Sequence, residues 1–267
     1  MINSSYLSKK LGALGITTND VLFVHSAFSA VGPVDGGSDA IIDAFLEAVG
    51  PGGTVIFPTF TSASESFSHE NSKALTGILC EKFRHRPGAI RSLHPTHSVA
   101  AIGKQAHYFA GDKWVVDTTC GEGSMFMRLA RSEAKIIMLG VDLNRCTLLH
   151  ACEDKFDYIV PSFDITPPVN QQTITTINKF PIGHRMFIHL MEYMRNQPWF
   201  VQGYIGDARA LVFPAKAMFD YCEKALKGNP YMFLCNNHSC NICTKIRKGT
   251  EANTGSCPDV NCEICVA

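Results

Sequence analysis

Hydrophobic residues in the first part of the chain occur either in short unbroken runs or with helical spacing. The apolar run 21–24 is bounded by polar residues and predicts a buried strand. Apolar residues then recur with helical spacing over 41–49, until the glycine-rich segment 50–53 ends the predicted helix and a second apolar run follows at 54–57. A strand, a loop, a helix and a second strand form a β-α-β unit, which favours a largely parallel α/β sheet.

Similar patterns continue to about residue 226. Residues 160–182 hold several prolines and many Thr, Asn and Gln, so this segment is expected to be an extended or hairpin insertion and not a helix. We therefore predict an α/β fold, a three-layer sandwich with a central largely parallel or mixed sheet, followed by a small Cys-rich C-terminal tail. The further elements expected are strands at 98–102 and 135–141 and helices at 7–14, 149–155, 187–194 and 215–226.

Composition narrows the classes of partner. The chain holds 24 Lys and Arg against 24 Asp and Glu, so no strong field exists to attract nucleic acid or an anionic membrane. The start of the chain shows no signal peptide, and the longest apolar runs, such as 136–141, are far shorter than the roughly 18 residues of a membrane span. We expect a cytoplasmic protein with a small-molecule partner and without nucleic acid or membrane partners; a homodimer stays open.

The segment from His25 to Gly37 follows the first predicted strand. Ligands of open α/β sheets usually bind at the carboxyl end of a strand. Backbone N–H groups there can face a phosphate or a pantetheine amide, and glycine allows a ligand to approach closely. The segment matches neither the Walker lysine loop nor the dinucleotide glycine fingerprint. The residues alone leave a ligand loop and a merely tight connection equally open.

Several sequence blocks follow one another in a specific order. They are 24–32 with Gly36-Gly37, 50–60, 91–103, 121–124, and 139–141 followed by 147–153. Together, from about residue 5 to 226, these blocks resemble the aminoglycoside 3-N-acetyltransferase family. The resemblance implies acetyl-CoA or another acyl-CoA as donor, a primary amine on an amino sugar as acceptor, and a link to antibiotic resistance.

The chemistry of that reaction fits a pair of residues in the last block. A primary amine is protonated at neutral pH, so its attack on a thioester requires a base and a donor for the developing oxyanion. His150 and Glu153 lie three residues apart at a predicted helix start and share one face, so the carboxylate can orient the imidazole. Without the resemblance, an ordinary pair on a helix surface would be the better interpretation. The resemblance implies His150 as base, Glu153 as its partner and Thr147 as a hydrogen-bond donor near the thioester.

Two more histidines, His94 and His97, bracket Pro95-Thr96 before a predicted strand, where both could simply bind loop backbone groups. The resemblance implies that His94 lies near the site, whereas the family usually lacks a histidine at 97. Arg91 could pair with a CoA phosphate or with a nearby carboxylate. Metal binding by these histidines is disfavoured, because no carboxylate or cysteine lies beside them at ligand spacing. The candidate catalytic residues are thus His150, Glu153, Thr147 and His94, and the candidate CoA-binding residues are His25, Ser26, Ala27, Phe28, Ser29, Val34, Gly36, Gly37, Arg91 and Ser98.

The end of the chain departs from the family. Six cysteines repeat one spacing twice, Cys-x4-Cys-x2-Cys, with His238 as an additional ligand candidate. A polar segment needs such a staple to fold, so a structural zinc site is the favoured interpretation. Disulfides, free thiols and an iron–sulfur site are alternatives, although the fourth cysteine of a plant-type iron–sulfur loop is not in place. We predict an acyltransferase domain at 1–229 and a metal-binding tail at 230–267, with the ligands Cys235, Cys240, Cys243, Cys257, Cys262 and Cys265.

Two questions of function stay open at this stage. Aminoglycosides are polycations that favour an acidic cleft, whereas a nucleotide-linked amino sugar carries phosphates, and the net charge of zero does not point to an acidic site. The antibiotic acceptor therefore rests on the resemblance. The alternative function is a catalytically inactive, metal-tailed binding protein that keeps the fold. Retention of Thr147, His150 and Glu153 together argues against this alternative.

Overall fold

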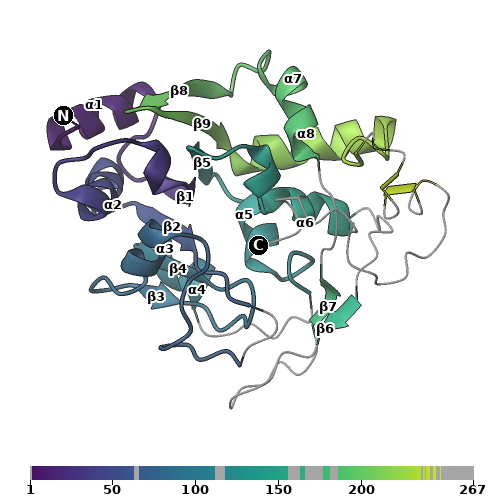
Figure 1. The fold of residues 1–267 in the computed structure, drawn as a ribbon, viewed down its shortest axis with the longest axis horizontal. Helices are drawn as coiled ribbons and strands as arrows, with labels where there is room; N and C mark the ends of the chain where they lie inside the picture. Colours follow the sequence, from purple (N-terminus) through teal and green to yellow (C-terminus); the bar gives the residue numbers. More distant parts are fainter. Residues whose placement is uncertain are drawn as a thin grey trace.

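The computed structural model describes residues 2–62, 66–111, 118–155, 163–165, 177–180, 186–235, 237, 239–240, 243–244 and 247. Within these residues, seven strands form one mixed sheet in the order β3-β4-β2-β1-β5-β9-β8, and β6 and β7 form a separate antiparallel pair (Figure 1). The strands are β1 (Val21–Ser26), β2 (Thr54–Pro58), β3 (Ile90–Arg91), β4 (Val99–Gly103), β5 (Lys135–Leu139), β6 (Phe163–Ile165), β7 (Ile177–Phe180), β8 (Val201–Ile205) and β9 (Ala208–Pro214).

Three parallel strands occupy the middle of the sheet. β1 pairs with β2 on one side and with β5 on the other, so that Phe23 lies opposite Ile56 and Ile136. β4 and β9 flank this centre and run antiparallel to β2 and β5. The carboxyl ends of β1, β2 and β5 therefore meet at one edge of the sheet, the place where α/β sheets usually bind ligands.

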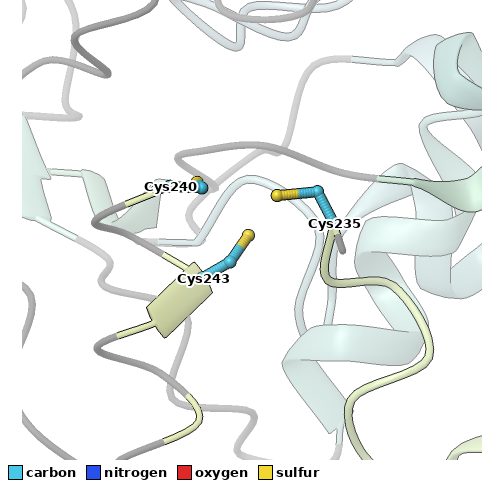
Figure 2. Close-up of side chains that lie close together, drawn as sticks. All are labelled: Cys235, Cys240 and Cys243. Carbon is cyan, nitrogen blue, oxygen red and sulfur yellow. The ribbon is translucent and has the colours of Figure 1, made fainter. Parts of the chain in front are cut away.

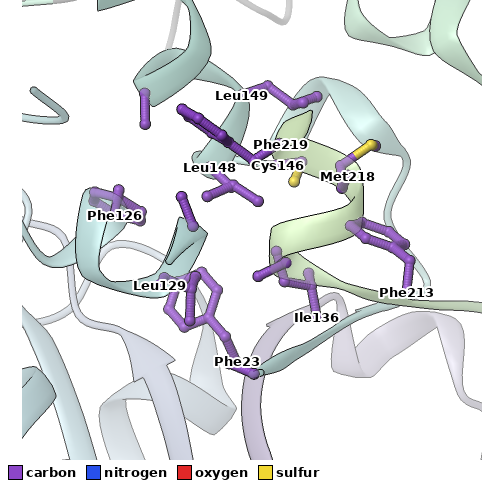
Figure 3. Packing of buried hydrophobic residues seen from close by; sticks show 14 of the residues in the cluster. Phe23, Phe126, Leu129, Ile136, Cys146, Leu148, Leu149, Phe213, Met218 and Phe219 are labelled. Carbon is purple, nitrogen blue, oxygen red and sulfur yellow. The ribbon is translucent and has the colours of Figure 1, made fainter. Parts of the chain in front are cut away.

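Helices cover both faces of the sheet, which confirms the predicted three-layer fold. Along β1, Leu22 and Val24 belong to the core beneath α1, α2 and α3, whereas Phe23 belongs to the core beneath α4, α5, α6 and α8. Figure 3 shows this second core, to which Phe23, Phe126 and Met218 all belong. The helices are α1 (Ser4–Ala13), α2 (Gly37–Val49), α3 (Ile78–Phe83), α4 (Ala106–Ala110), α5 (Met125–Ala130), α6 (Leu148–Lys155), α7 (Leu190–Met194) and α8 (Ala215–Gly228), with the 3-10 turns η1 (Phe28–Ala30), η2 (Leu143–Arg145) and η3 (Phe187–His189).

Cap residues explain where some of these helices begin. The side chain of Asn3 accepts a hydrogen bond from the Tyr6 N–H (3.0 Å) at the start of α1, and Ser124 Oγ accepts one from the Met127 N–H (3.2 Å) at the start of α5. α2 begins instead after Gly36, whose φ of +77° is a left-handed conformation that favours glycine.

The C-terminal half differs in detail from the predicted elements. The helix expected at 187–194 is a 3-10 turn, η3, followed by α7. Within the 160–182 insertion, β6 and β7 pair as a hairpin would, and the rest of that segment lies outside the described residues. α8 ends at Gly228, and the domain boundary after residue 229 stays a prediction. In the described part of the chain, no helix is both long enough and apolar enough to cross a membrane.

Candidate active site

The loop that leaves β1 carries most of the residues predicted to bind CoA. His25 and Ser26 end β1, and the Ala27 N–H donates to the carbonyl of Leu139 (2.8 Å), which holds the loop against the end of β5. Ser29 and Gly36 are exposed. The loop therefore lies at the ligand-binding edge of the sheet with groups accessible from solvent. Half-buried in it are Ser26, Ala27, Phe28, Val34 and Gly37.

His25 is the buried member of this group. Its ring lies edge-on to Phe23 at 4.7 Å between centroids, and only 5% of the residue is exposed. Burial lowers the pKa of His25 to about 3, so the imidazole is neutral at pH 7. Its Nε2 has no hydrogen-bond partner among the described residues. A buried ring nitrogen without a partner is one that a bound ligand could satisfy.

His150 and Glu153 meet in the way that their spacing on α6 predicts. His150 Nδ1 lies 2.7 Å from Glu153 Oε2, with the carboxylate buried and the imidazole side chain 21% exposed. Thr147 is buried directly before α6, and its carbonyl accepts the N–H of His150 (3.1 Å). The geometry fixes one ring nitrogen of His150 on a carboxylate and leaves the imidazole partly accessible.

An aromatic residue supports the imidazole from another segment. The ring of Phe187, in η3, lies edge-on to His150 with 5.0 Å between centroids and an angle of 71°. Phe187 is completely buried. Sequence reasoning missed this contact because a phenylalanine in an apolar helical pattern carries no signal of what its ring will touch.

His94 and His97 form a second imidazole pair at the loop before β4. His94 Nδ1 accepts the backbone N–H groups of His97 (2.9 Å) and Thr96 (3.2 Å), and burial lowers the pKa of His94 to about 4. The ring of His97 packs on Phe60 at 4.5 Å between centroids. Burial, then the charges of His94 and His150, lower the pKa of His97 well below its usual range. The fold thus brings His97 within electrostatic reach of His150, which the spacing of residues 94 and 97 alone did not indicate.

Arg91 and Ser98 are held by the chain's own groups. The Arg91 guanidinium donates to the carbonyls of Ser72 (2.7 Å), His69 (2.9 Å) and Thr59 (3.0 Å) and to Ser98 Oγ (3.2 Å). Both residues are buried, and burial lowers the pKa of Arg91 to about 10. These contacts explain Arg91 as a tie between loops, so a role for Arg91 and Ser98 in binding CoA stays a prediction without geometric support.

Three of the six tail cysteines come together. The sulfur atoms of Cys235, Cys240 and Cys243 all lie within 4.8 Å of one another, and their side chains converge in Figure 2. All three residues are buried, and burial raises the pKa of Cys243 to about 12. We call this group the thiol cluster. Predicted ligands that lie outside the described residues are His238, Cys257, Cys262 and Cys265.

A hollow of about 1000 Å³ is lined by residues of η3, α7, α8 and the turn 231–234. None of the predicted site residues lines it. The candidate active site is therefore defined by the edge of the sheet, where the His25 loop leaves β1, and by the His150–Glu153 pair.

A three-layer α/β fold that carries a histidine–carboxylate pair on the helix after a central strand defines the class of protein. Residues 23–227 match the family described as aminoglycoside 3-N-acetyltransferase. The chain belongs to this family. The resemblance seen in the sequence is thereby confirmed.

Relatives of known name agree with this assignment. Aminoglycoside N(3)-acetyltransferase VIII of Streptomyces fradiae is 34% identical over an alignment of 170 residues, and the match covers 55% of this chain and 59% of that protein. The chain thus spans less than two thirds of the length of this relative. A structure of AAC-IIIb with CoASH is 28% identical, with a TM-score of 0.75, and covers 85% of this chain and 96% of that one. A mutant of aminoglycoside acetyltransferase AAC(3)-IVa in complex with gentamicin shares the fold, with a TM-score of 0.85 at 23% identity over 92% of this chain and 97% of that one.

Proposed function

We propose that this protein is an N-acyltransferase that moves an acetyl group, or another short acyl group, from CoA to a primary amine on an amino sugar. The observation that carries the proposal is the contact of 2.7 Å between His150 Nδ1 and Glu153 Oε2 on α6, the helix that follows the central strand β5. Family membership supports it, as does the presence of CoA in the AAC-IIIb structure.

His150 is the base in this proposal. Its Nδ1–H donates to Glu153, so Nε2 carries the lone pair that accepts a proton from the acceptor ammonium. The freed amine nitrogen attacks the thioester carbonyl, forms the new C–N bond and displaces the CoA sulfur. The proton held by His150 passes to that sulfur as the C–S bond breaks, and the second proton that the nitrogen loses passes to solvent water, so that a neutral amide and the CoA thiol are formed. The buried carboxylate of Glu153 stabilises the imidazolium between these two transfers, and Thr147 is proposed to donate to the developing oxyanion.

The charges around the base favour a cationic acceptor. His25, His94 and His97 are neutral at pH 7, because burial lowers the pKa of each, so they add no positive charge. Burial, and then the charges of Asp154 and Glu153, raise the pKa of Cys120 well above its usual range, so both carboxylates lie within electrostatic reach of this thiol. Neutral imidazoles beside carboxylates suit a polycationic aminoglycoside better than a phosphate-bearing nucleotide sugar.

The loop from His25 to Gly37 is proposed to hold the pantetheine or the phosphates of CoA. Its backbone N–H groups lie at the carboxyl end of β1 and at the beginning of α2, where a helix N-terminus favours negative charge. An added Cβ at Gly37 would meet no atom within 4 Å, so the protein itself leaves room there. His25 Nε2 is a buried group that this ligand could satisfy.

The thiol cluster is proposed to hold one zinc ion. A tetrahedral site with Zn–S distances of about 2.3 Å places its sulfur atoms about 3.8 Å apart, so three thiols within 4.8 Å need only a small adjustment. Three thiolates bind zinc in preference to cations such as Mg²⁺ and Ca²⁺, which favour oxygen ligands. The second cysteine set, Cys257, Cys262 and Cys265, stays a prediction, as does the domain boundary.

The test is release of CoA thiol from acetyl-CoA in the presence of a panel of amines. Aminoglycosides and nucleotide-linked amino sugars form the two arms, and the same mixtures without amine give the background. We expect amine-dependent release with aminoglycosides well above that with nucleotide-linked amino sugars. No release above the background with any amine of the panel would instead support the inactive binding protein.

A further inference from the structure

The segment that leads into the thiol cluster also packs against the aromatic ring that contacts His150. Phe233 lies two residues before Cys235 and is 1% exposed. Its ring stands edge-on to Phe187, with 4.8 Å between centroids and an angle of 90°. Phe187 in turn lies edge-on to His150. Two phenylalanine rings in contact thus join the cysteine segment to the imidazole.

Backbone hydrogen bonds fasten the same two segments together. The Met186 N–H donates to the carbonyl of Phe233 (2.9 Å), and His189 Nδ1 donates to the carbonyl of Met232 (3.1 Å). Met186 also packs against the apolar side of the thiol cluster. Residues on both sides of Phe187 are therefore hydrogen-bonded to the segment 229–235, which follows α8 and which we call the strip.

A further contact carries this support to the loop before α6. Asn144 Oδ1 accepts the N–H of Ile188 (2.9 Å), so η3 is held to η2, just upstream of Thr147 and His150. Between α8 and Cys235, the strip is shaped by turn bonds such as Leu234 N–H to the Tyr231 carbonyl (2.9 Å), while Tyr231 itself is 45% exposed. The strip is thus buried at Phe233 and at the thiol cluster, whereas its beginning is exposed.

We infer that a zinc ion bound by Cys235, Cys240 and Cys243 acts as a clamp that sets the position of the His150 imidazole through Phe233 and Phe187. The inference rests on the proposed function for the role of His150, and it assigns Phe187 and Phe233 as positioning residues. With the cluster closed on the metal, the strip cannot withdraw Phe233 from Phe187. Without the metal, only the packing of Phe233 and a few hydrogen bonds hold it, and the imidazole loses the support of the Phe187 ring.

The experiment uses the full chain purified under reducing conditions without chelator, and compares it with Cys240→Ser. Zinc content, the NMR resonances of the His150 imidazole and the rates of acetyl transfer are measured on each. We expect about one zinc per chain in the original protein, and loss of the metal, a shifted His150 resonance and a kcat lower on the order of tenfold in Cys240→Ser, with KM for acetyl-CoA little changed. The His150 resonance is assigned by its absence in His150→Ala.

Two further variants separate the clamp from a general loss of structure. Phe187→Leu keeps all three thiols, so it should retain zinc and yet shift the His150 resonance and lower kcat. Cys80→Ser makes the same chemical change at a buried thiol of α3, on the opposite face of the sheet, and should alter neither zinc content nor the resonance.

Several results would overturn the inference. Zinc that persists in Cys240→Ser, or a zinc content far below one in the original chain, would reject the metal site. A His150 resonance that stays in place when zinc is lost would reject the clamp. The metal and NMR measurements need no acceptor, so they decide the inference even if no amine is acetylated, an outcome that would count against the proposed function alone.

Discussion

In the proposed reaction, the contact between His150 and Glu153 orients the base. Replacing Glu153 by glutamine keeps a hydrogen-bond acceptor but removes the charge that stabilises the imidazolium, so kcat should fall less than in His150→Ala. Steady-state kinetics of both variants, with acetyl-CoA and the best acceptor, measure the difference. Equal losses would mean that the two side chains act only as one unit.

The buried imidazoles predict how stability changes with pH. His94 has a folded-state pKa of about 4 against an ordinary value of 6.5, so between these values the unfolded chain binds a proton that the folded chain does not. The free energy of unfolding therefore carries the full contribution of His94 above pH 6.5. It falls as the pH falls toward 4, by up to about 1.4 kcal/mol per pH unit for each such histidine.

In the variant His94→Asn, the free energy of unfolding should change less steeply with pH, because the contribution of His94 is removed. Its side-chain oxygen can accept the backbone N–H groups that His94 Nδ1 accepts, but it does not titrate. Urea unfolding over this pH range gives the slope for each protein. A slope as steep as that of the original chain would show that His94 takes up its proton equally well in the folded state.

At this scale, the sequence indicated contacts within one helix better than contacts between segments. The His150–Glu153 pair follows from spacing on α6 once the family motif singles it out. The partners of Arg91 could not be foreseen, because its guanidinium binds carbonyls 19 to 32 residues away in the chain. Loop carbonyls leave no pattern in the sequence.

The loop between β1 and α2 makes a prediction about CoA. Gly37 has a φ of +63°, so Gly37→Ala should cost about 1–2 kcal/mol of stability from backbone strain alone. If the loop binds CoA through its backbone, the added methyl group should also weaken CoA binding on the order of tenfold. Calorimetry measures both the affinity and the unfolding. Unaltered affinity in a folded variant would remove this loop from the CoA site.

A second alanine variant controls for the substitution itself. Gly12 lies in helix α1 with no atom within 4 Å of an added Cβ. Gly12→Ala should therefore gain about 0.5–1 kcal/mol of stability and leave CoA affinity unchanged.

Strands with unbroken apolar runs were predicted from the sequence, whereas short helices and a flanking hairpin were not. The runs at 21–24 and 54–57 appear as β1 and β2. The hairpin of β8 and β9 was missed, although Gly206-Asp207 between two apolar stretches is a recognised hairpin signal. Helices α3, α4 and α5 have only five or six residues, too few turns for helical spacing to be visible.

At the scale of the whole molecule, we expect the stability of the fold to depend on the strip that follows α8. Phe233 belongs to the same core as Leu148 and Phe187, although it lies beyond the boundary predicted after residue 229. A chain that ends at 229 should therefore lose about 3–5 kcal/mol of stability, the usual cost of removing a buried phenylalanine. A chain that ends at 247 keeps Phe233 and should lose much less.

Urea unfolding of the two truncated chains, with Phe233→Ala in the full chain as the matched comparison, measures this dependence. The chain that ends at 229 should lose at least as much stability as Phe233→Ala does. Equal stability of all the chains would show that the fold is independent of the strip.

Topology at this scale was predicted in part. The β-α-β unit could be predicted from apolar runs, because a helix between two strands enforces a parallel crossover. The antiparallel placement of β4 and β9 on either side was not derivable. The direction of a strand depends on the path of the connection before it, and the length of that connection alone does not fix the direction.

The most direct test of the account is the mass of the acceptor after incubation with acetyl-CoA, for the original chain and for His150→Ala at matched CoA occupancy. The account predicts one added acetyl group on an aminoglycoside amine with the original chain. It also predicts a rate lower by a factor on the order of 10² to 10⁴ with His150→Ala, while CoA affinity is kept. An acceptor that gains no mass, or a variant that transfers acetyl as fast as the original chain, would contradict it.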